Sequence, residues 1–353
     1  MIKDAYRVIG IMSGTSLDGI DLAHLTLWYD ERWHFEIHAA ETIPYSETWR
    51  ATLKNLVKVS SEELKAIDNN YTQYLAETIN EFMAANHIKE LDAVCSHGHT
   101  ALHQPENHFT YQIGNLPALA QLIDQTVVCN FRVADMKLGG QGAPLVPIGD
   151  QLLFPDYDMC INLGGFANCS SEENGKRIAY DICPVNIVLN HYAKLLGQDY
   201  DAEGLIAKSG FVHKTLLDQL NQLPFYAQQA PKSLGLEWVE AQVTPIIAAH
   251  SCSVIDVIST FTAHAAQQIA KTIKSGANVL FTGGGTYNDF LLSHIKLQRD
   301  FNLIKPSHAL IDYKEALIFG LLGVLKLRNE VNCLASVTGA KQNHSSGQIW
   351  IPK

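Results

Sequence analysis

The chain carries, at residues 10–21, the stretch Gly10-Ile11-Met12-Ser13-Gly14-Thr15-Ser16-Leu17-Asp18-Gly19-Ile20-Asp21. The segments 6–11 and 20–28 around its polar tip are apolar, so we predict the two strands of a β-hairpin. A tip of small residues exposes backbone N–H groups and hydroxyls to an anion. Carboxylates beside that anion suit a hydrated Mg²⁺. The stretch therefore indicates a phosphate and magnesium site of a nucleotide enzyme, although the same residue types also make ordinary hairpin loops.

Two common nucleotide motifs are absent from the sequence. There is no Gly-x-x-x-x-Gly-Lys-Ser/Thr segment, and no Gly-x-Gly-x-x-Gly follows an expected strand. The chain therefore has the fingerprint of neither a P-loop nor a dinucleotide fold.

Composition limits the class of protein. A length of 353 residues suggests two domains, and 47% hydrophobic with 18% charged residues is typical of a well-packed chain. The net charge of −10, with no basic cluster, argues against nucleic acid as a partner. The seven cysteines include no Cys-x-x-Cys pair, which favours buried free thiols. No apolar stretch reaches membrane-spanning length, so we expect a cytoplasmic protein with no membrane partner.

The expected elements repeat between the two halves of the chain. Beyond the hairpin, the patterns predict strands at 34–42, 91–96, 126–131, 159–163, 177–181 and 278–282, and helices at 60–86, 116–124, 185–196, 243–274 and 314–327. We therefore predict an α/β fold with duplicated βββαβα units and a cleft between two lobes. Residues 1–145 form the expected N-terminal lobe, with 330–353 packing back onto it, and residues 146–329 form the C-terminal lobe.

Glycine-rich segments follow three of the expected strands, at 14–19, 164–165 and 283–285. Each one alone is compatible with a turn, but three in a two-lobed α/β pattern suit a nucleotide, which needs close backbone approach. Asn168 and Asn288 lie three residues after the last glycine of their segments. We expect them to add hydrogen bonds to the nucleotide.

The chain resembles the anhydro-N-acetylmuramic acid kinases, a family of the actin, sugar kinase and Hsp70 ATPase superfamily. The matching blocks, in order, are Gly14-Thr15-Ser16-Leu17-Asp18-Gly19-Ile20-Asp21, Ser96-His97-Gly98-His99-Thr100, Gln112-Ile113-Gly114-Asn115, Phe131-Arg132-Val133-Ala134-Asp135, Gly139-Gly140-Gln141-Gly142-Ala143-Pro144-Leu145, Asn162-Leu163-Gly164-Gly165-Phe166-Ala167-Asn168, Thr282-Gly283-Gly284-Gly285, Lys314-Glu315-Ala316 and Ser336-Val337-Thr338-Gly339-Ala340. The resemblance implies a two-lobed actin-like ATPase fold with ATP and Mg²⁺ in the interlobe cleft.

The resemblance also implies a reaction. Such a kinase opens 1,6-anhydro-N-acetylmuramic acid with water and phosphorylates O6, giving N-acetylmuramic acid 6-phosphate and ADP in peptidoglycan recycling. A carboxylate base must deprotonate the attacking water. Asp181 occupies the family's base position, although an acidic cap for a helix starting near Pro184 is an alternative. A homodimer is consistent with the resemblance.

The implied site residues fall into three groups. The expected ATP ligands are Gly14, Thr15, Ser16, Leu17, Asp18, Gly19, Asp21, Gly164, Gly165, Asn168, Gly283, Gly284, Gly285 and Asn288. The expected metal ligands are Asp18 and Asp21. The expected substrate ligands are His97, His99, Arg132, Asp135, Gln141, Gly142, Asn186 and Glu315. Two of these have simpler interpretations, since Arg132 is also placed to pair with Asp135, and Glu315 to favour a helix N-terminus.

One departure from the family concerns the segment after Asp181. The family has Asp-Thr-Gly-Pro-Gly-Asn where this chain has Asp181-Ile182-Cys183-Pro184-Val185-Asn186. If the family's glycines have positive φ, Val185 would be strained there.

Two rival functions remain open at this point. One is an ATP-binding relative of the same fold without catalysis. The other is a metal-dependent hydrolase built on the run His97, His99, His103 and His108.

Overall fold

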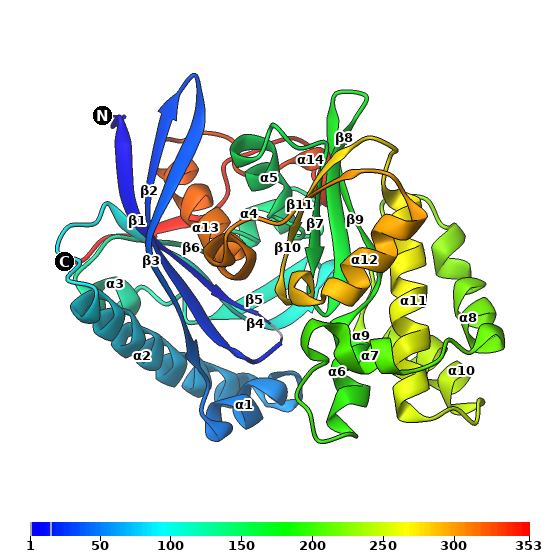
Figure 1. Ribbon diagram of the computed structural model, residues 1–353. Helices are drawn as coiled ribbons and strands as arrows, with labels where there is room; N and C mark the ends of the chain where they lie inside the picture. Colours follow the sequence, from blue (N-terminus) through cyan, green and yellow to red (C-terminus); the bar gives the residue numbers. More distant parts are fainter. Residues whose placement is uncertain (1, 15) are drawn as a thin grey trace. The chain divides into compact units, whose positions relative to one another are not determined.

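The protein divides into two compact units, each built around one β-sheet (Figure 1). The computed structural model describes residues 2–14 and 16–353, so the expected phosphate ligand Thr15 lies outside the described residues. The first unit runs up to Phe154 and includes Tyr313–Lys353, and the second unit is Pro155–Asp312. Sheets and helices in both units confirm the predicted α/β class.

The first unit has a seven-stranded sheet in the order β12-β6-β4-β1-β2-β3, with β5 paired to β4. Its strands are β1 (Ala5–Ser13), β2 (Gly19–Asp30), β3 (Arg32–Pro44), β4 (Ala93–Gln104), β5 (Phe109–Ile113), β6 (Val127–Cys129) and β12 (Gln348–Trp350). Its helices are α1 (Glu47–Lys54), α2 (Ser61–Ala85), α3 (Ala118–Ile123), α4 (Val133–Lys137), α5 (Pro147–Leu153), α14 (Ala335–Thr338) and most of α13 (His308–Leu327).

The second unit has a five-stranded sheet in the order β11-β10-β7-β8-β9. Its strands are β7 (Met159–Leu163), β8 (Phe166–Glu173), β9 (Lys176–Pro184), β10 (Asn278–Thr282) and β11 (Asn302–Ile304). Its helices are α6 (Asn186–Lys194), α7 (Leu205–Ser209), α8 (Lys214–Asn221), α9 (Leu236–Trp238), α10 (Thr244–Ala248), α11 (Val254–Thr272) and α12 (Asp289–Gln298), with a π-helical turn at Val239–Val243.

The two sheets share one topology, which confirms the predicted duplication. In each unit the first three strands form an antiparallel meander, β1-β2-β3 and β7-β8-β9. Beside the first strand of each meander, one strand adds in parallel and a second adds in parallel to that one: β4 and then β6 in one unit, β10 and then β11 in the other. Short loops are enough for the meander, whereas each parallel addition needs a helical crossover.

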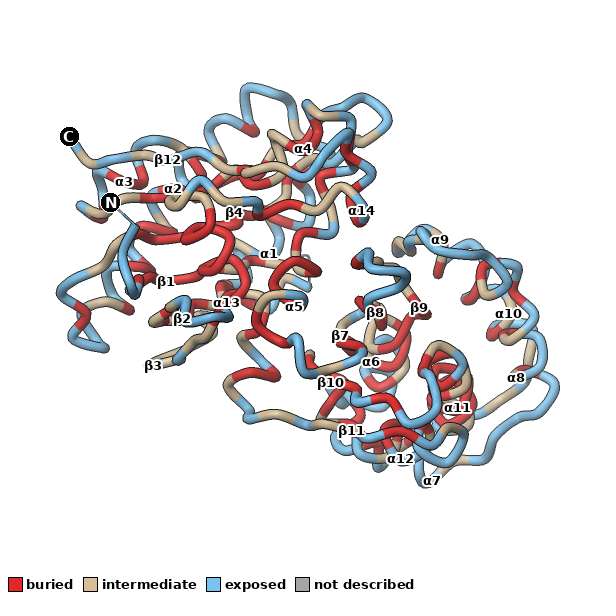
Figure 2. Tube along the Cα trace, turned by 90° about the horizontal axis from the view of Figure 1, so that it is seen from above, coloured by how far each residue is buried: buried red, intermediate tan, exposed pale blue. Residues whose placement is uncertain are grey.

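Strand β1 is buried on both faces and packs against a different helix on each (Figure 2). Ile9 and Ile11 belong to the core cluster that includes Leu75 of α2. The alternate residue Gly10 faces α13, where an added Cβ would lie 1.9 Å from the carbonyl oxygen of Ala316. Successive side chains of a strand point to opposite faces, so one helix packs on each. The helix α13 therefore approaches β1 backbone to backbone.

Helix α13 also explains why the units differ from the predicted lobes. The division falls at Tyr313, where the backbone leaves helical values with φ −113° and ψ 15°. Residues 146–154 and 313–329, predicted within the C-terminal lobe, belong to the first unit. Local periodicity gives the length of this helix but not the sheet against which it packs.

The prediction that a strand ends at His97-Gly98-His99 is wrong. Strand β4 continues through these residues to Gln104 and forms a hairpin with β5. Gly98 has φ +73°, and the pairing of β1 with β4 shifts register between Ile11 and Ser13. A bulge at a glycine lets a strand continue past a residue that looks like a terminus. Across the described part of the chain, no helix combines the length and hydrophobicity that crossing a membrane requires.

We predict that Gly10→Ala destabilises the first unit by about 3 kcal/mol or more, because the new methyl group meets backbone atoms that cannot move aside. Gly284→Ala is the matched control, since an added Cβ there meets nothing within 4 Å. The control should change stability by less than about 1 kcal/mol. Urea unfolding followed by circular dichroism measures both variants. Equal unfolding midpoints for the two would contradict the close packing of α13 on β1.

Candidate functional site

The tip between β1 and β2 combines accessible and occupied groups. Ser16 and Asp18 are exposed, and Leu17 donates its backbone N–H to the carbonyl of Gly14 at 3.4 Å. Asp21 is half-buried, and its Oδ1 accepts a hydrogen bond from Thr42 Oγ1 at 2.6 Å. The exposed carboxylate of Asp18 is an oxygen donor of the kind that Mg²⁺ prefers.

Gly19 has a packing role in the same tip. It begins β2, and an added Cβ would lie 2.4 Å from the carbonyl oxygen of Ile43 on β3. Position 19 therefore requires glycine because β2 and β3 come close together there, and this requirement is independent of any ligand of the tip.

A buried polar network anchors the end of β1. The Ser13 hydroxyl lies 2.8 Å from His99 Nδ1 and 2.6 Å from Tyr45 Oη, which in turn lies 2.6 Å from Tyr71 Oη. Burial lowers the pKa of His99 to about 4, so this ring is neutral at pH 7. His99, expected among the substrate ligands, thus holds the strand end that leads into the tip. No local pattern predicts Tyr45 or Tyr71 at this site, because Tyr45 reaches Ser13 from a distant segment and Tyr71 joins the network through Tyr45.

His97 and Arg132 form a second buried contact in the first unit. His97 Nδ1 lies 2.8 Å from the carbonyl of Gly98 and must donate to it, which leaves Nε2 as the acceptor for Arg132 Nε at 3.0 Å. Burial, followed by the charge of Arg132, holds the pKa of His97 well below its usual value. Arg132 Nη1 donates to the carbonyl of Gly142 at 2.8 Å, while its Nη2 has no hydrogen-bond partner among the described residues. Burial lowers the pKa of Arg132 to about 10, so the guanidinium stays charged at neutral pH.

Asp135 is fully buried and does not pair directly with Arg132. Its Oδ2 accepts from the Gly142 N–H at 2.7 Å, and its Oδ1 accepts from Thr338 Oγ1 at 2.6 Å. Gly142 therefore links the two side chains, since its carbonyl accepts a hydrogen bond from Arg132 and its N–H donates one to Asp135. Gln141 is exposed, and its N–H donates to the carbonyl of Thr338 at 2.8 Å. The contacts of Asp135 make it a positioning residue for this loop.

Glu315 lies within α13 beside a buried ion pair. The ammonium of Lys314 is 2.6 Å from Asp150 Oδ1, and both side chains are almost fully buried. Burial raises the pKa of Glu315, while the charges of Lys314 and Arg132 oppose that rise. Tyr313 interrupts α13, so Glu315 lies in the first turn of the helical segment that follows the kink, as the helix N-terminus interpretation expects. Glu315 also interacts with the cationic side chains of Lys314 and Arg132.

In the second unit, the two glycine-rich segments meet at one edge of the sheet. Strands β7 and β10 are neighbours, with Asn162 opposite Thr282, so Gly164 and Gly283 both follow strand ends at the same edge. An added Cβ on Gly283 would lie 2.3 Å from Asn162 Oδ1. Asn186 Nδ2 donates to the carbonyl of Leu163 at 3.1 Å, which adds the start of α6 to this edge. An added Cβ on Gly284 would meet nothing within 4 Å, so the backbone of this glycine is open to close approach by a ligand.

Asp181 lies in β9 and is held by a loop that is distant in sequence. Its N–H donates to the carbonyl of Lys232 at 3.0 Å, and its Oδ2 accepts from the Leu234 N–H at 2.8 Å. Oδ1 has no hydrogen-bond partner among the described residues, and the side chain is half-buried. Burial raises the pKa of Asp181, and the Leu234 hydrogen bond offsets this only in part. The alternative of a helix cap is wrong, since Val185 is the N-cap of α6.

The residues that replace the family's glycines pack into the core. Cys183 and Val185 are both fully buried, and Val185 has φ −132°. Neither residue has positive φ. Val185 is therefore free of the strain that a positive φ would impose on a β-branched residue.

The two asparagines predicted beside the nucleotide differ in their settings. Asn288 caps α12, since its Oδ1 accepts from the Leu291 N–H at 2.8 Å. Asn168 lies in β8, between Asn162 on β7 and Asp181 on β9. Asn168 is therefore the cross-strand neighbour of the candidate base.

The histidine run does not form a metal site within residues 2–14 and 16–353. His97 and His99 are engaged with Arg132 and Ser13, and His103 Nδ1 lies 3.2 Å from Thr110 Oγ1. Among the described residues, side chains of metal-ligating types come together at another place, at Asp135, Cys333 and His344. The hydrolase alternative therefore lacks its site.

The chain as a whole is similar to proteins of one known family. The family model for anhydro-N-acetylmuramic acid kinase matches residues 6–352. The chain is 33% identical over 372 residues to the anhydro-N-acetylmuramic acid kinase of Actinobacillus pleuropneumoniae serotype 7, covering 99% of this chain and 100% of the relative. It is 35% identical over 378 residues to the enzyme of the same name from Mannheimia succiniciproducens, again covering 99% and 100%.

Among solved structures, the activator of the 2-hydroxyisocaproyl-CoA dehydratase from Clostridium difficile with bound ADPNP aligns at a TM-score of 0.41 and 12% identity, over 91% of this chain and 96% of that chain. The agreement in sequence extends over almost the whole length of the chain and of its relatives. The protein therefore belongs to the anhydro-N-acetylmuramic acid kinase family.

Proposed function

We propose that the protein opens the 1,6-anhydro ring of N-acetyl-anhydromuramic acid with water and transfers the γ-phosphoryl group of ATP to O6. Membership of the family supports the reaction class. The observation that carries the catalytic assignment is the environment of Asp181: a half-buried carboxylate with a raised pKa, oriented by one backbone N–H, with Oδ1 left for a ligand. A general base needs this combination of fixed geometry and increased basicity.

Ring opening and phosphoryl transfer are coupled in the proposed reaction. Asp181 takes a proton from water as the water oxygen forms a bond to C1, and the C1–O6 bond breaks. The electron pair released on O6 attacks the γ-phosphorus, and the bond from that phosphorus to the bridging oxygen of ADP breaks. The products are N-acetylmuramic acid 6-phosphate and ADP.

We assign phosphate binding to the glycine-rich segments, with Gly14 and Ser16 in the first unit and Gly164, Gly165 and 283–285 in the second. Their backbone N–H groups suit an anion because few side chains stand in the way. We propose that Asp18 holds Mg²⁺ through its exposed carboxylate. Asp21, the other expected metal ligand, accepts a hydrogen bond from Thr42. When bound, Mg²⁺ neutralises charge on the phosphates.

We assign recognition of the sugar to Arg132, with His97, Gly142 and Glu315 around it. The lactyl carboxylate of the substrate suits the guanidinium donors that remain after the bonds to His97 and Gly142 are made. A role for the protein in cytoplasmic peptidoglycan recycling follows from this substrate. A homodimer is part of the same proposal.

The direct test is an ADP-release assay with purified protein, anhydro-sugar and Mg²⁺, run in ¹⁸O-labelled water. We expect ADP release that requires both sugar and metal, phosphate on O6 by NMR, and one ¹⁸O atom at C1. Release of ADP without label at C1 would contradict the coupled ring opening. Bound ATP without sugar-stimulated turnover would favour a non-catalytic relative instead.

We predict that Asp181→Asn lowers kcat by about 10²- to 10⁴-fold, because the amide keeps the hydrogen bond to Leu234 but cannot accept the proton. The matched control is Asp201→Asn, since Asp201 is also a buried carboxylate held by backbone N–H groups in the second unit. Steady-state ADP release by variants with native circular dichroism measures the effect. Equal loss in both variants would contradict a specific role for Asp181.

As the pH is lowered, the activity should begin to fall at a higher pH than the one at which the carboxyl group of an exposed aspartate becomes protonated. Burial raises the pKa of Asp181, so its carboxylate becomes protonated, and inactive as a base, earlier as the pH falls. A profile of kcat/KM against pH measures the acid limb. The residual rate of Asp181→Asn should lack this limb, and a limb that persists unchanged in this variant would assign it to another group.

Arg132→Lys should raise KM for the anhydro-muramic substrate by about 10- to 100-fold with a smaller change in kcat, because one charge-assisted bond is lost. The matched control is Arg299→Lys, whose Nε donates to the carbonyl of Ala270 in the second unit. Assays with 1,6-anhydro-N-acetylglucosamine, which lacks the lactyl carboxylate, separate loss of carboxylate binding from a general disturbance of the sugar site. If Arg132 binds that carboxylate, the variant should discriminate less between the sugars, whereas unchanged discrimination would contradict the assignment.

A further inference from the structure

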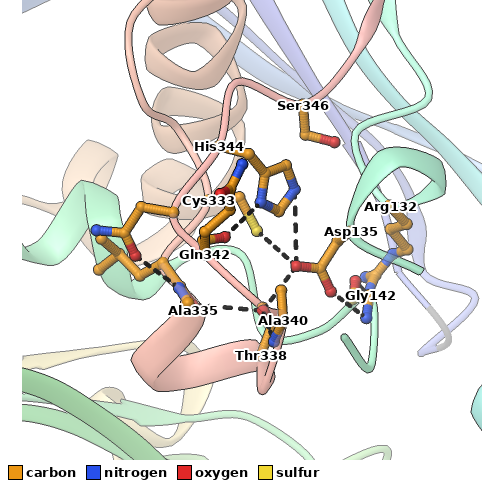
Figure 3. Close-up of polar contacts among 12 residues, drawn as sticks. Arg132, Asp135, Gly142, Cys333, Ala335, Thr338, Ala340, Gln342, His344 and Ser346 are labelled. Carbon is orange, nitrogen blue, oxygen red and sulfur yellow. Dashed lines mark hydrogen bonds and ion pairs between the residues drawn. The ribbon is translucent and has the colours of Figure 1, made fainter. Parts of the chain in front are cut away.

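A cluster of three metal-ligating side chains lies in the first unit, within 4.8 Å of one another (Figure 3). Asp135 comes from α4, while Cys333 and His344 come from the C-terminal segment. The backbones of Cys333 and His344 form an antiparallel bridge, with N–H to carbonyl distances of 3.1 and 3.2 Å in the two directions. Residues paired directly across such a bridge lie close together. Both side chains point toward Asp135 (Figure 3).

The ring of His344 is oriented with an unused nitrogen toward this cluster. Its Nδ1 lies 3.1 Å from the carbonyl of Gln342 and donates to it, so in the neutral ring Nε2 carries the lone pair. The side chain is 8% exposed, and Nε2 has no hydrogen-bond partner among the described residues. A buried nitrogen without a partner is costly. A backbone carbonyl on the opposite nitrogen is the usual way in which a metal-binding histidine is oriented.

The distances between the ligand atoms suit one ion. Asp135 Oδ1 is 3.1 Å from Cys333 Sγ and 3.7 Å from His344 Nε2. A tetrahedral zinc with bonds of about 2.0–2.3 Å places its ligand atoms about 3.3–3.8 Å apart. The two separations from Asp135 Oδ1 are close to this range, and Cys333 Sγ and His344 Nε2 lie within 4.8 Å of each other.

The chemistry of the donors selects the metal. A thiolate, an imidazole and a carboxylate suit Zn²⁺ and Co²⁺, whereas Mg²⁺ and Ca²⁺ prefer oxygen donors alone. Loss of the thiol proton of Cys333 to solvent on binding would leave one thiolate and one carboxylate, whose charges together neutralise a divalent ion. A neutral complex is what a fully buried position requires.

We propose that Asp135, Cys333 and His344 bind one Zn²⁺ ion, as a structural site separate from the phosphate and sugar residues. The ion ties the C-terminal segment to α4. The other carboxylate oxygen of Asp135, Oδ2, accepts a hydrogen bond from the Gly142 N–H. A bound ion that holds Asp135 in place therefore also holds the loop of Gly142, whose carbonyl contacts Arg132.

The test uses the full chain, stripped with a chelator and titrated with Co²⁺. We expect about one Co²⁺ per chain with a thiolate-to-cobalt charge-transfer band, displaced by Zn²⁺. Cys333→Ser should lose the band and bind more weakly by over about 100-fold, more than the loss of an outer-shell partner causes. The serine hydroxyl can still donate to Asp135, so the variant keeps the hydrogen bond of the metal-free site.

The matched control is Cys129→Ser, another buried cysteine of the first unit, whose thiol donates to the Asn115 carbonyl. This control should bind Co²⁺ as the unmodified protein does. His344→Gln gives a second readout, since it should weaken binding and leave any remaining band altered. The proposal is overturned if the stripped protein binds no Co²⁺ or Zn²⁺, or if Cys333→Ser binds as tightly as Cys129→Ser. Those results would favour an ion pair between His344 and Asp135.

Discussion

The first unit depends on the contact between α13 and β1, where two backbones touch. Gly10 on the strand lies against the backbone of Ala316, and Gly320 on the helix lies against the side chains of Leu25 and Val8. Close packing of this kind resists sliding of the helix along the strand. The same strand leads to Ser13 and the polar tip, while the same helix carries Lys314 and Glu315. One steric constraint thus positions both the tip that we propose to bind phosphate and Glu315, which we propose to lie beside the sugar.

Neutral histidines are the second organising feature of this unit. His97 and His99 are both buried, and their low pKa values keep them uncharged. An uncharged ring accepts the hydrogen bond of Arg132 without repelling it. The positive charge near Gly142 therefore stays on the guanidinium, which is the group that we propose to bind the substrate carboxylate.

Sequence patterns predicted the local elements well and the long-range contacts poorly. The strands at 159–163 and 278–282 and the helix at 60–86 were predictable, because periodicity is a property of neighbouring residues. The hairpin of β4 and β5 was missed, since a bulge glycine resembles a strand end. In the site, the glycine segments were visible in the sequence. The Leu234 hydrogen bond to Asp181 was not, because the two residues are 53 positions apart and no pattern links them.

The last residues of the chain complete the sheet of the first unit. Strand β12 pairs with β6 in antiparallel register, and Trp350 Nε1 donates to the carbonyl of Asn115 at 3.2 Å. Without this segment, β6 would become an edge strand with unpaired N–H and carbonyl groups open to intermolecular pairing. Proteolytic trimming, or a fusion that pulls the tail outward, would therefore replace the short edge strand β12 with the buried strand β6, whose newly unpaired groups would promote aggregation.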